Sequence, residues 1–179
     1  MEDEPYQEVY FIGIALPSEL DRRIAKLKNQ LYEADSDLLE PVMPHVTLLH
    51  PPSLAGIMPS QLIPEVRRVA RRYLPLTIAL NDLGSFGDSV AFVEAESLKL
   101  RSLQSQLVKL LPTEAQASHY RRPYRPHITI AQKYEPKALD QVMIAAAINR
   151  ELQLPVSFTV ENISYFKRIL PRRYRPEVI

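Results

Sequence analysis

The sequence repeats itself after about 80 residues, and this repeat limits the possible folds more than any other feature of the chain. An offset shared by several segments indicates two copies of one structural unit. Two such units within 179 residues are expected to pack around a pseudo-two-fold axis. The matching segments are Pro44–Thr47 with Pro126–Thr129 at an offset of 82, and Leu74–Leu80 with Leu154–Val160 and Phe86 with Phe166 at an offset of 80.

Each copy is expected to fold as strand, helix, strand, helix and strand. Runs rich in β-forming residues indicate the strands, and apolar positions at helical spacing indicate the helices. In the first copy, residues 8–86, we predict strands at 8–16, 45–50 and 76–86 and helices at 17–34 and 60–73. In the second copy, residues 89–168, we predict strands at 89–96, 127–132 and 155–168 and helices at 98–111 and 136–150, with a further strand at 173–179.

These elements predict one α+β domain over residues 1–179. A hydrophobic content of 46% is enough for one compact domain with a core. The expected architecture is bilobal, with duplicated β-α-β-α-β units and antiparallel sheets around a central cleft. Two arrangements agree with the sequence, because the units can form separate lobes or exchange strands.

Both copies carry a His-x-Thr motif on a predicted strand. Residues two apart in a strand point to the same face, so His45 shares a face with Thr47, and His127 shares one with Thr129. The apolar residue between each pair then points the other way, into a core. A pseudo-symmetric arrangement of the two strands would bring both pairs onto one cleft.

Two imidazoles and two hydroxyls on one cleft are suited to cleaving a phosphodiester. Histidine titrates near neutral pH, so one ring can act as general base and the other as general acid. Threonine hydroxyls can donate hydrogen bonds to the non-bridging oxygens. A single motif would be explained by a structural, hydrogen-bonded histidine. Two motifs, each after a proline and at the same place in the repeat, favour a catalytic quartet of His45, Thr47, His127 and Thr129, with neither a metal ion nor a cofactor implied.

The paired motifs, HVTL at 45–48 and HITI at 127–130, resemble those of the 2H phosphoesterase superfamily. This superfamily includes 2′-5′ RNA ligase-like proteins and cyclic phosphodiesterases. The resemblance covers essentially the whole chain, in length, motif separation and element order. It implies a bilobal α+β fold with a central cleft, and a catalytic role for the quartet. The reaction it implies is metal-independent hydrolysis of 2′,3′-cyclic phosphates or related 2′-linked nucleotide phosphodiesters.

Two other functions use the same cleft. A 2′-5′ RNA ligase would have the same site and a different substrate, and a nucleotide- or RNA-binding module would have the cleft without catalysis. The segments His50–Pro52 and Ala131–Lys133, which follow the motifs, depart from the pattern of many ligase-like members. A binding module needs no pairing of two imidazoles with two hydroxyls, so an enzyme is favoured.

Basic and aromatic residues near the second motif are candidates for holding the substrate. Arginine guanidinium groups bind phosphates in a fork, and tyrosine rings stack on bases. The alternative for the loop 119–126 is a solvated surface segment, and His50 is expected to have a structural or surface role. The candidate substrate-binding residues are Arg122, Tyr124, Arg125, Lys133 and Arg173.

Composition excludes several other classes of function. The net charge is only +1, which disfavours wrapping of duplex DNA. The absence of cysteine excludes disulfides and thiolate zinc sites, and four glycines provide no glycine-rich phosphate loop. The acidic first ten residues do not resemble a signal peptide, and no apolar run is long enough to span a membrane. We therefore expect a cytoplasmic, monomeric protein that acts on RNA ends or on a small nucleotide with a cyclic phosphate.

Overall fold

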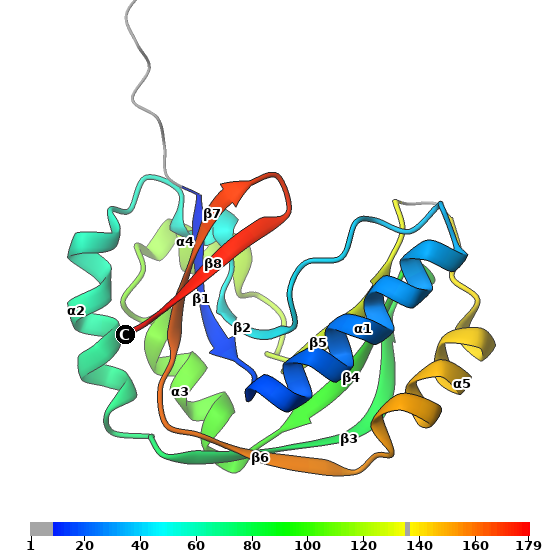
Figure 1. The fold of residues 1–179 in the computed structure, drawn as a ribbon. Coiled ribbons are helices and arrows are strands. Elements are labelled where there is room, and N and C mark those ends of the chain that lie inside the picture. The colour runs from blue at the N-terminus through cyan, green and yellow to red at the C-terminus, as the bar shows by residue number, and fades with distance from the viewer. Residues whose placement is uncertain (1–8, 135–136) are drawn as a thin grey trace, which may run out of the picture.

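The computed structural model describes residues 9–134 and 137–179, which form two four-stranded antiparallel sheets flanked by helices (Figure 1). The predicted α+β class with two antiparallel sheets is confirmed. The first sheet has the order β2-β1-β7-β8, with β2 at His45–Leu49, β1 at Tyr10–Ala15, β7 at Ser164–Leu170 and β8 at Arg173–Val178. The second has the order β5-β4-β3-β6, with β5 at His127–Gln132, β4 at Val90–Glu96, β3 at Leu76–Phe86 and β6 at Val156–Val160.

The two repeats exchange strands. Strand β3 belongs to the first repeat, but it lies in the second sheet between β4 and β6. Strand β7 belongs to the second repeat, but it lies in the first sheet beside β1. The prediction of one strand over 155–168 is therefore wrong, because this segment forms β6 in one sheet and then β7 in the other. Both parts are rich in β-forming residues, so the sequence contains no sign that the chain changes sheets between them.

The pairing of β3 with β6 places the pseudo-two-fold axis. Ile78 pairs with Phe158, which occupies the same position in the other repeat. On either side of this pair, Leu76 faces Val160 and Leu80 faces Val156, as a two-fold axis between the strands requires. The cis peptide bonds at Leu74-Pro75 and Leu154-Pro155 also stand at equivalent positions.

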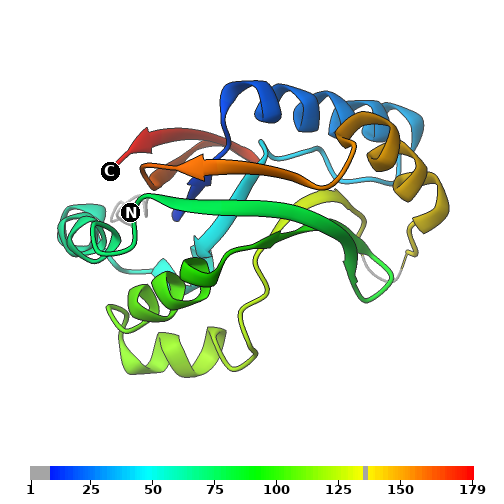
Figure 2. The same cartoon turned by 90° about the horizontal axis from the view of Figure 1, so that it is seen from below.

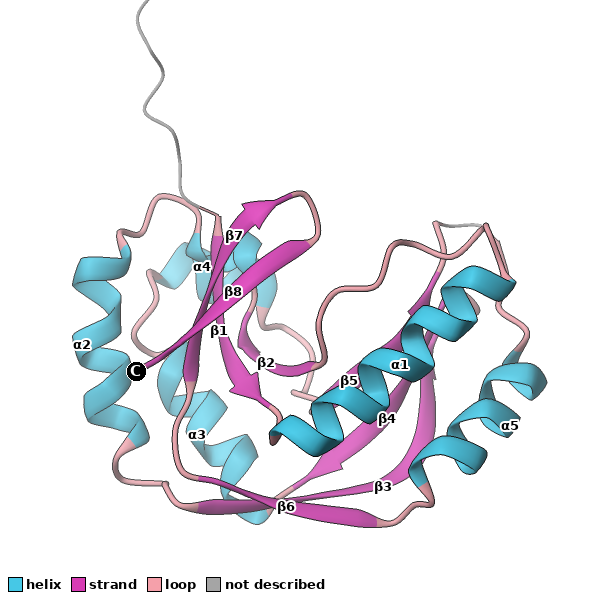
Figure 3. Ribbon diagram, viewed as in Figure 1, coloured by secondary structure: helices cyan, strands magenta, loops and turns pink. Residues whose placement is uncertain are grey.

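The helices are exchanged in the same way. Helix α1 (Ser18–Ala34) follows β1 but contacts β5 and α5 (Gln141–Leu152), on the side of the second sheet. Helix α3 (Leu98–Val108) follows β4 but contacts β2 and α2 (Pro59–Ala70), on the side of the first sheet. Figures 2 and 3 show these two helix pairs on opposite sides of the molecule. Each repeat therefore contributes to both halves of the fold.

Matching apolar stripes anchor α1 and α3. The stripe of Ile24, Leu27 and Leu31 on α1 is buried. On α3, the buried stripe contains Leu100, Leu103 and Leu107. Burial of such side chains contributes roughly 1.5–3 kcal/mol each, so these stripes hold the helices against the sheets.

Some predicted boundaries differ from the structure. Helix α5 begins at Gln141 instead of residue 136, because the Asp140 side chain caps it by accepting a hydrogen bond from the Met143 N–H at 2.9 Å. Helix α2 ends at Ala70, three residues early. The 3-10 helix η1 (Pro51–Leu54) and the short helix α4 (Thr113–His119) were not predicted. The predicted elements that reach residues 8 and 136 extend there outside the described residues. No helix in the described ranges combines the length and apolar character needed to cross a bilayer.

Candidate active site

The two His-x-Thr motifs lie on neighbouring strands from different sheets. His45 and Thr47 are on β2, and His127 and Thr129 are on β5. These are edge strands, and they contact each other without forming a ladder. Val46 and Ile128 are fully buried, whereas the four motif side chains stay partly exposed. Strand alternation therefore turns both motifs toward the space between the sheets.

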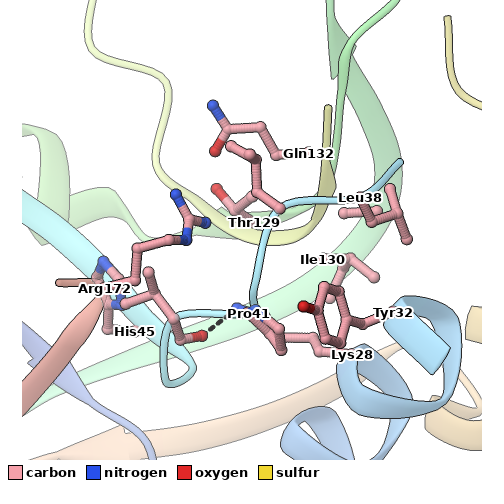
Figure 4. A pocket seen from close by; sticks show the side chains of 12 residues that line it. Lys28, Tyr32, Leu38, Pro41, His45, Thr129, Ile130, Gln132 and Arg172 are labelled. Carbon is pink, nitrogen blue, oxygen red and sulfur yellow. Dashed lines mark hydrogen bonds between the residues drawn. The ribbon is translucent and has the colours of Figure 1, made fainter. Parts of the chain in front are cut away.

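Two pockets divide the quartet between them, and each pocket combines the two repeats. The small pocket has a volume of about 190 Å³ and is lined by His45 and Thr129 (Figure 4). The large pocket has a volume of about 1050 Å³ and is lined by His127 and Thr47. Each imidazole is thus grouped with the hydroxyl of the other motif, which neither repeat could achieve alone.

Backbone carbonyl groups fix the tautomer of both histidines. The Nδ1 of His45 lies 2.7 Å from the carbonyl oxygen of Met43, and the Nδ1 of His127 lies 2.7 Å from that of Arg125. A carbonyl oxygen can only accept, so each Nδ1 carries a hydrogen and donates it. This leaves Nε2 of each ring as the atom that can take up or release a proton toward a substrate.

A pair of phenylalanine rings packs against the imidazole of each motif histidine. The His45 ring packs on Phe11 and Phe166, with centroid distances of 4.6 and 5.5 Å. The His127 ring packs on Phe86 and Phe92, both at 4.9 Å. The rings within each phenylalanine pair are 4.4 Å apart. Sequence reasoning matched Phe86 with Phe166 but did not assign either a role, although aromatic residues at equal places in both repeats were the available signal.

Burial lowers the pKa of both motif histidines. The pKa of His45 falls to about 4, chiefly because of burial, with smaller contributions from the charges of Lys28 and His127. The pKa of His127 is also lowered, first by burial and then by the nearby charge of Arg125, while the hydrogen bond to the Arg125 carbonyl opposes the shift. The neutral form of His45 is therefore favoured more strongly than that of His127.

Three of the predicted substrate-binding residues line the large pocket. The Tyr124 hydroxyl donates a 2.7 Å hydrogen bond to the carbonyl oxygen of Thr47, and burial raises the pKa of Tyr124. Arg125 pairs with Glu94 and lies over the Phe92 ring, 4.8 Å from its centroid. Arg122 is exposed at the same pocket. The loop that precedes β5 therefore forms a wall of the site.

The other two candidates are engaged elsewhere. Lys133 forms a 2.8 Å ion pair with Asp35 and lowers the pKa of that carboxyl. Arg173 is exposed and reaches Glu40 at 3.4 Å. Neither residue lines the two pockets. Instead, Lys28 and Arg172 line the small pocket. Nothing in the sequence pattern pointed to Lys28, whereas Arg172 belongs to the same basic cluster, 172–175, as Arg173.

His50 lies in the large pocket rather than apart from the site. Its ring stacks on Tyr120 at 5.0 Å and meets His119 edge-on at 5.1 Å. Ser53 Oγ and the Tyr120 hydroxyl are 2.7 Å apart, which fixes the ring of Tyr120. Together these residues form an aromatic rim on the large pocket.

The buried Lys28 is expected to make the stability of the protein depend on pH. Burial, followed by the charge of Arg172, lowers the pKa of Lys28 to about 7. Between about pH 10 and 7 the unfolded chain binds a proton at this position that the folded chain does not, so stability falls as the pH falls through this range. We expect Lys28→Met to raise the free energy of unfolding at pH 7 by about 2–4 kcal/mol and to weaken this pH dependence. Denaturant titrations at several pH values would measure this, with Lys26→Met on the exposed face of α1 as the control. The same stability and pH dependence in both variants would contradict the prediction.

The fold and its site define a class of protein. Two antiparallel sheets related by a pseudo-two-fold axis, with one His-x-Thr strand from each repeat at their junction, make the chain a 2H phosphoesterase. More closely, the chain belongs to the 2′-5′ RNA ligase superfamily, whose family model matches residues 16–170.

Solved structures agree with this assignment at the level of the fold. TT0787 of Thermus thermophilus is 21% identical, with a TM-score of 0.63 over 96% of this chain and 94% of that protein. Apo LigT of E. coli is 20% identical, with a TM-score of 0.61 over 97% and 95% of the two chains. A complex of E. coli LigT with 3′-AMP is 19% identical, with a TM-score of 0.62 over 97% and 95%. No curated protein sequence gives a significant match.

Proposed function

We propose that this protein is a phosphodiesterase that hydrolyses 2′,3′-cyclic phosphates, or related 2′-linked nucleotide phosphodiesters, without a metal ion. The observation that carries the proposal is the pairing of two imidazoles, each with Nδ1 bound to a backbone carbonyl oxygen and Nε2 left for proton transfer. A phosphodiester between the two rings would have a proton acceptor on one side and a proton donor on the other. Both proton transfers are then supplied by side chains.

The hydrolytic step assigns one proton transfer to each histidine. Neutral His45 takes a proton from water through Nε2 as the water oxygen forms its bond to phosphorus. Protonated His127 gives its proton to the ribose oxygen as the bond between that oxygen and phosphorus breaks. The lower pKa of His45 favours it as the base. The hydroxyls of Thr47 and Thr129 donate hydrogen bonds to the non-bridging oxygens, where negative charge develops.

The lining of the large pocket is suited to a nucleotide substrate. Its lining includes aromatic rings, among them Tyr120 and Tyr124, on which a base can stack, and cations, among them Arg101 and Arg122, that can approach phosphates. The family to which the chain belongs carries RNA in its name, and E. coli LigT has been solved with 3′-AMP. These observations favour RNA ends or small nucleotides over other phosphodiesters.

A 2′-5′ RNA ligase is the second candidate, on account of the family. In that reaction a ribose hydroxyl would replace water as nucleophile, with the same two histidines transferring protons. The direct test is incubation of a short RNA ending in a 2′,3′-cyclic phosphate with EDTA, with and without an acceptor RNA that carries a 5′-hydroxyl. Release of a linear phosphate end supports hydrolysis, and a longer product supports ligation. Binding without turnover would leave only a nucleotide-binding module.

The dependence of kcat/KM on pH is expected to be bell-shaped, with its maximum below pH 6.5. The rate should rise as His45 loses its proton, around pH 4, and fall as His127 loses its own at a pH below the ordinary value of 6.5. Initial rates on a nucleoside 2′,3′-cyclic phosphate between pH 4 and 9 would measure this profile. A rate that increases steadily up to pH 9 would contradict the assignment of a protonated imidazole as the acid.

A further inference from the structure

The small pocket beside His45 has a cationic lining. Lys28 from α1 and Arg172 from the turn between β7 and β8 line it together with His45 and Thr129 (Figure 4). Among the described residues that line this pocket, none is acidic. Two basic side chains therefore line a space of about 190 Å³ whose lining contains no carboxylate.

Lys28 has a buried ammonium group. The residue is only 6% exposed and stands on the buried face of α1. Its Nζ donates a 2.5 Å hydrogen bond to the carbonyl oxygen of Val42, which leaves two further N–H donors. The carboxylate of Asp21, on the same helix, raises the pKa of Lys28. Burial and the charge of Arg172 lower this pKa by more. Burial disfavours the charged form of this lysine, and an anion bound in the pocket would favour it.

Arg172 is held in place from the opposite side of the pocket. Its backbone is left-handed, with φ of 59°, and its Nε donates a 2.5 Å hydrogen bond to the carbonyl oxygen of Glu40. This bond fixes the plane of the guanidinium and leaves its terminal nitrogens available. Arg172 and Lys28 line the same small pocket, so one ligand bound there can meet both side chains.

We propose that Lys28 and Arg172 form a subsite for a second phosphate of the substrate, separate from the phosphate that is cleaved. This inference rests on the proposed phosphodiesterase function. The small pocket has less than a fifth of the volume of the large one, so it suits a phosphate, whereas the large pocket suits a nucleoside. The preferred substrate is then a nucleotide with two phosphates, one over the quartet and one against Lys28 and Arg172.

The test compares substrates with and without a second phosphate. These are uridine 2′,3′-cyclic phosphate, its 5′-phosphorylated form, and a dinucleotide with the same cyclic end. Wild type is expected to favour at least one of the last two by about tenfold or more in kcat/KM, because charge-assisted hydrogen bonds are strong. Preference for the 5′-phosphorylated form identifies a terminal phosphate, and preference for the dinucleotide identifies an internal phosphodiester.

The preference should depend on the two cations. The preference is measured within each variant, as the ratio of kcat/KM between a substrate with the second phosphate and uridine 2′,3′-cyclic phosphate. Lys28→Met and Arg172→Gln are each expected to reduce this ratio severalfold or more. The matched controls are Lys26→Met and Arg168→Gln, which remove exposed charges from α1 and β7 outside the pocket and should keep the preference. Equal losses on all three substrates would assign the cations to the cleaved phosphate and overturn the proposal. Absence of any preference in wild type would overturn it as well.

A binding experiment separates this proposal from the proposed activity. By calorimetry, uridine 3′,5′-bisphosphate is expected to bind wild type about tenfold more tightly than uridine 3′-phosphate. Lys28→Met should remove this difference. If wild type cleaves none of the substrates but shows the difference, the subsite stands while the phosphodiesterase function fails. Equal affinity for the two ligands would overturn the subsite whether or not the protein is active.

Discussion

Replacement of His45 or His127 by alanine is expected to lower kcat/KM on a 2′,3′-cyclic phosphate by two orders of magnitude or more. Each imidazole would transfer one of the two protons, and its Nε2 has no substitute on the described strands β2 and β5. The double variant should lose little more than either single one, because a water-exposed phosphodiester gains little from a base without an acid. Steady-state kinetics with EDTA present would give these values. Thermal unfolding of the same samples would show that the fold is retained.

The two histidines can be distinguished by the leaving group. A nitrophenolate ion leaves without a proton, whereas a ribose oxygen requires one. On thymidine 3′-(4-nitrophenyl phosphate), His127→Ala should therefore recover much of its activity relative to wild type, and His45→Ala should not. The reverse result would exchange the roles of base and acid. Unchanged activity of either variant on the cyclic phosphate would refute the catalytic assignment.

Phe166→Ala is expected to lower the free energy of unfolding by about 3–5 kcal/mol, the usual cost of removing a fully buried aromatic ring. Phe166 is 0% exposed and stacks on Phe11 at 4.4 Å. Phe86 stands at the same position of the other repeat and is 39% exposed. Phe86→Ala should therefore cost less, about 1–2 kcal/mol. Both variants should also lower kcat/KM, because each ring supports a catalytic imidazole.

Denaturant unfolding followed by circular dichroism measures both free energies, and the repeat itself supplies the matched control. The two phenylalanines stand at equivalent positions and each has a histidine neighbour. The difference between the two losses of unfolding free energy therefore reports the difference in burial. Equal destabilisation by the two substitutions would contradict this. Loss of stability without loss of activity would show that the rings hold the sheets but do not position the imidazoles.

Much of the fold could be predicted from the repeat, because short runs of neighbouring residues mark its strands and motifs. Strands β3 and β5 have the bounds predicted from their β-forming residues and flanking prolines. The orientation of His45 and His127 follows from strand alternation, which depends only on neighbouring residues. The quartet could therefore be nominated from two short segments.

The remaining features depend on contacts between distant segments. Nothing within 155–168 distinguishes a long strand from two strands in different sheets, since the choice is made by the edges on which each part pairs. Lys28 stands on an amphipathic helix, where lysine is usually solvated, and only the crossing of α1 to the second sheet makes it a pocket residue. Arg172 and Arg173 are adjacent basic residues, and the turn between β7 and β8 decides which one enters the pocket.

The pairing of β1 with β7 also has a consequence for the order in which the protein can be completed during synthesis. Strand β1 spans Tyr10–Ala15, but its neighbour β7 begins only at Ser164. Phe166, which packs on His45, therefore emerges from the ribosome long after β1. Contacts between segments so far apart in sequence form slowly and leave apolar surface uncovered until then. The first sheet, and with it the surroundings of His45, can be completed only after β7 has emerged from the ribosome.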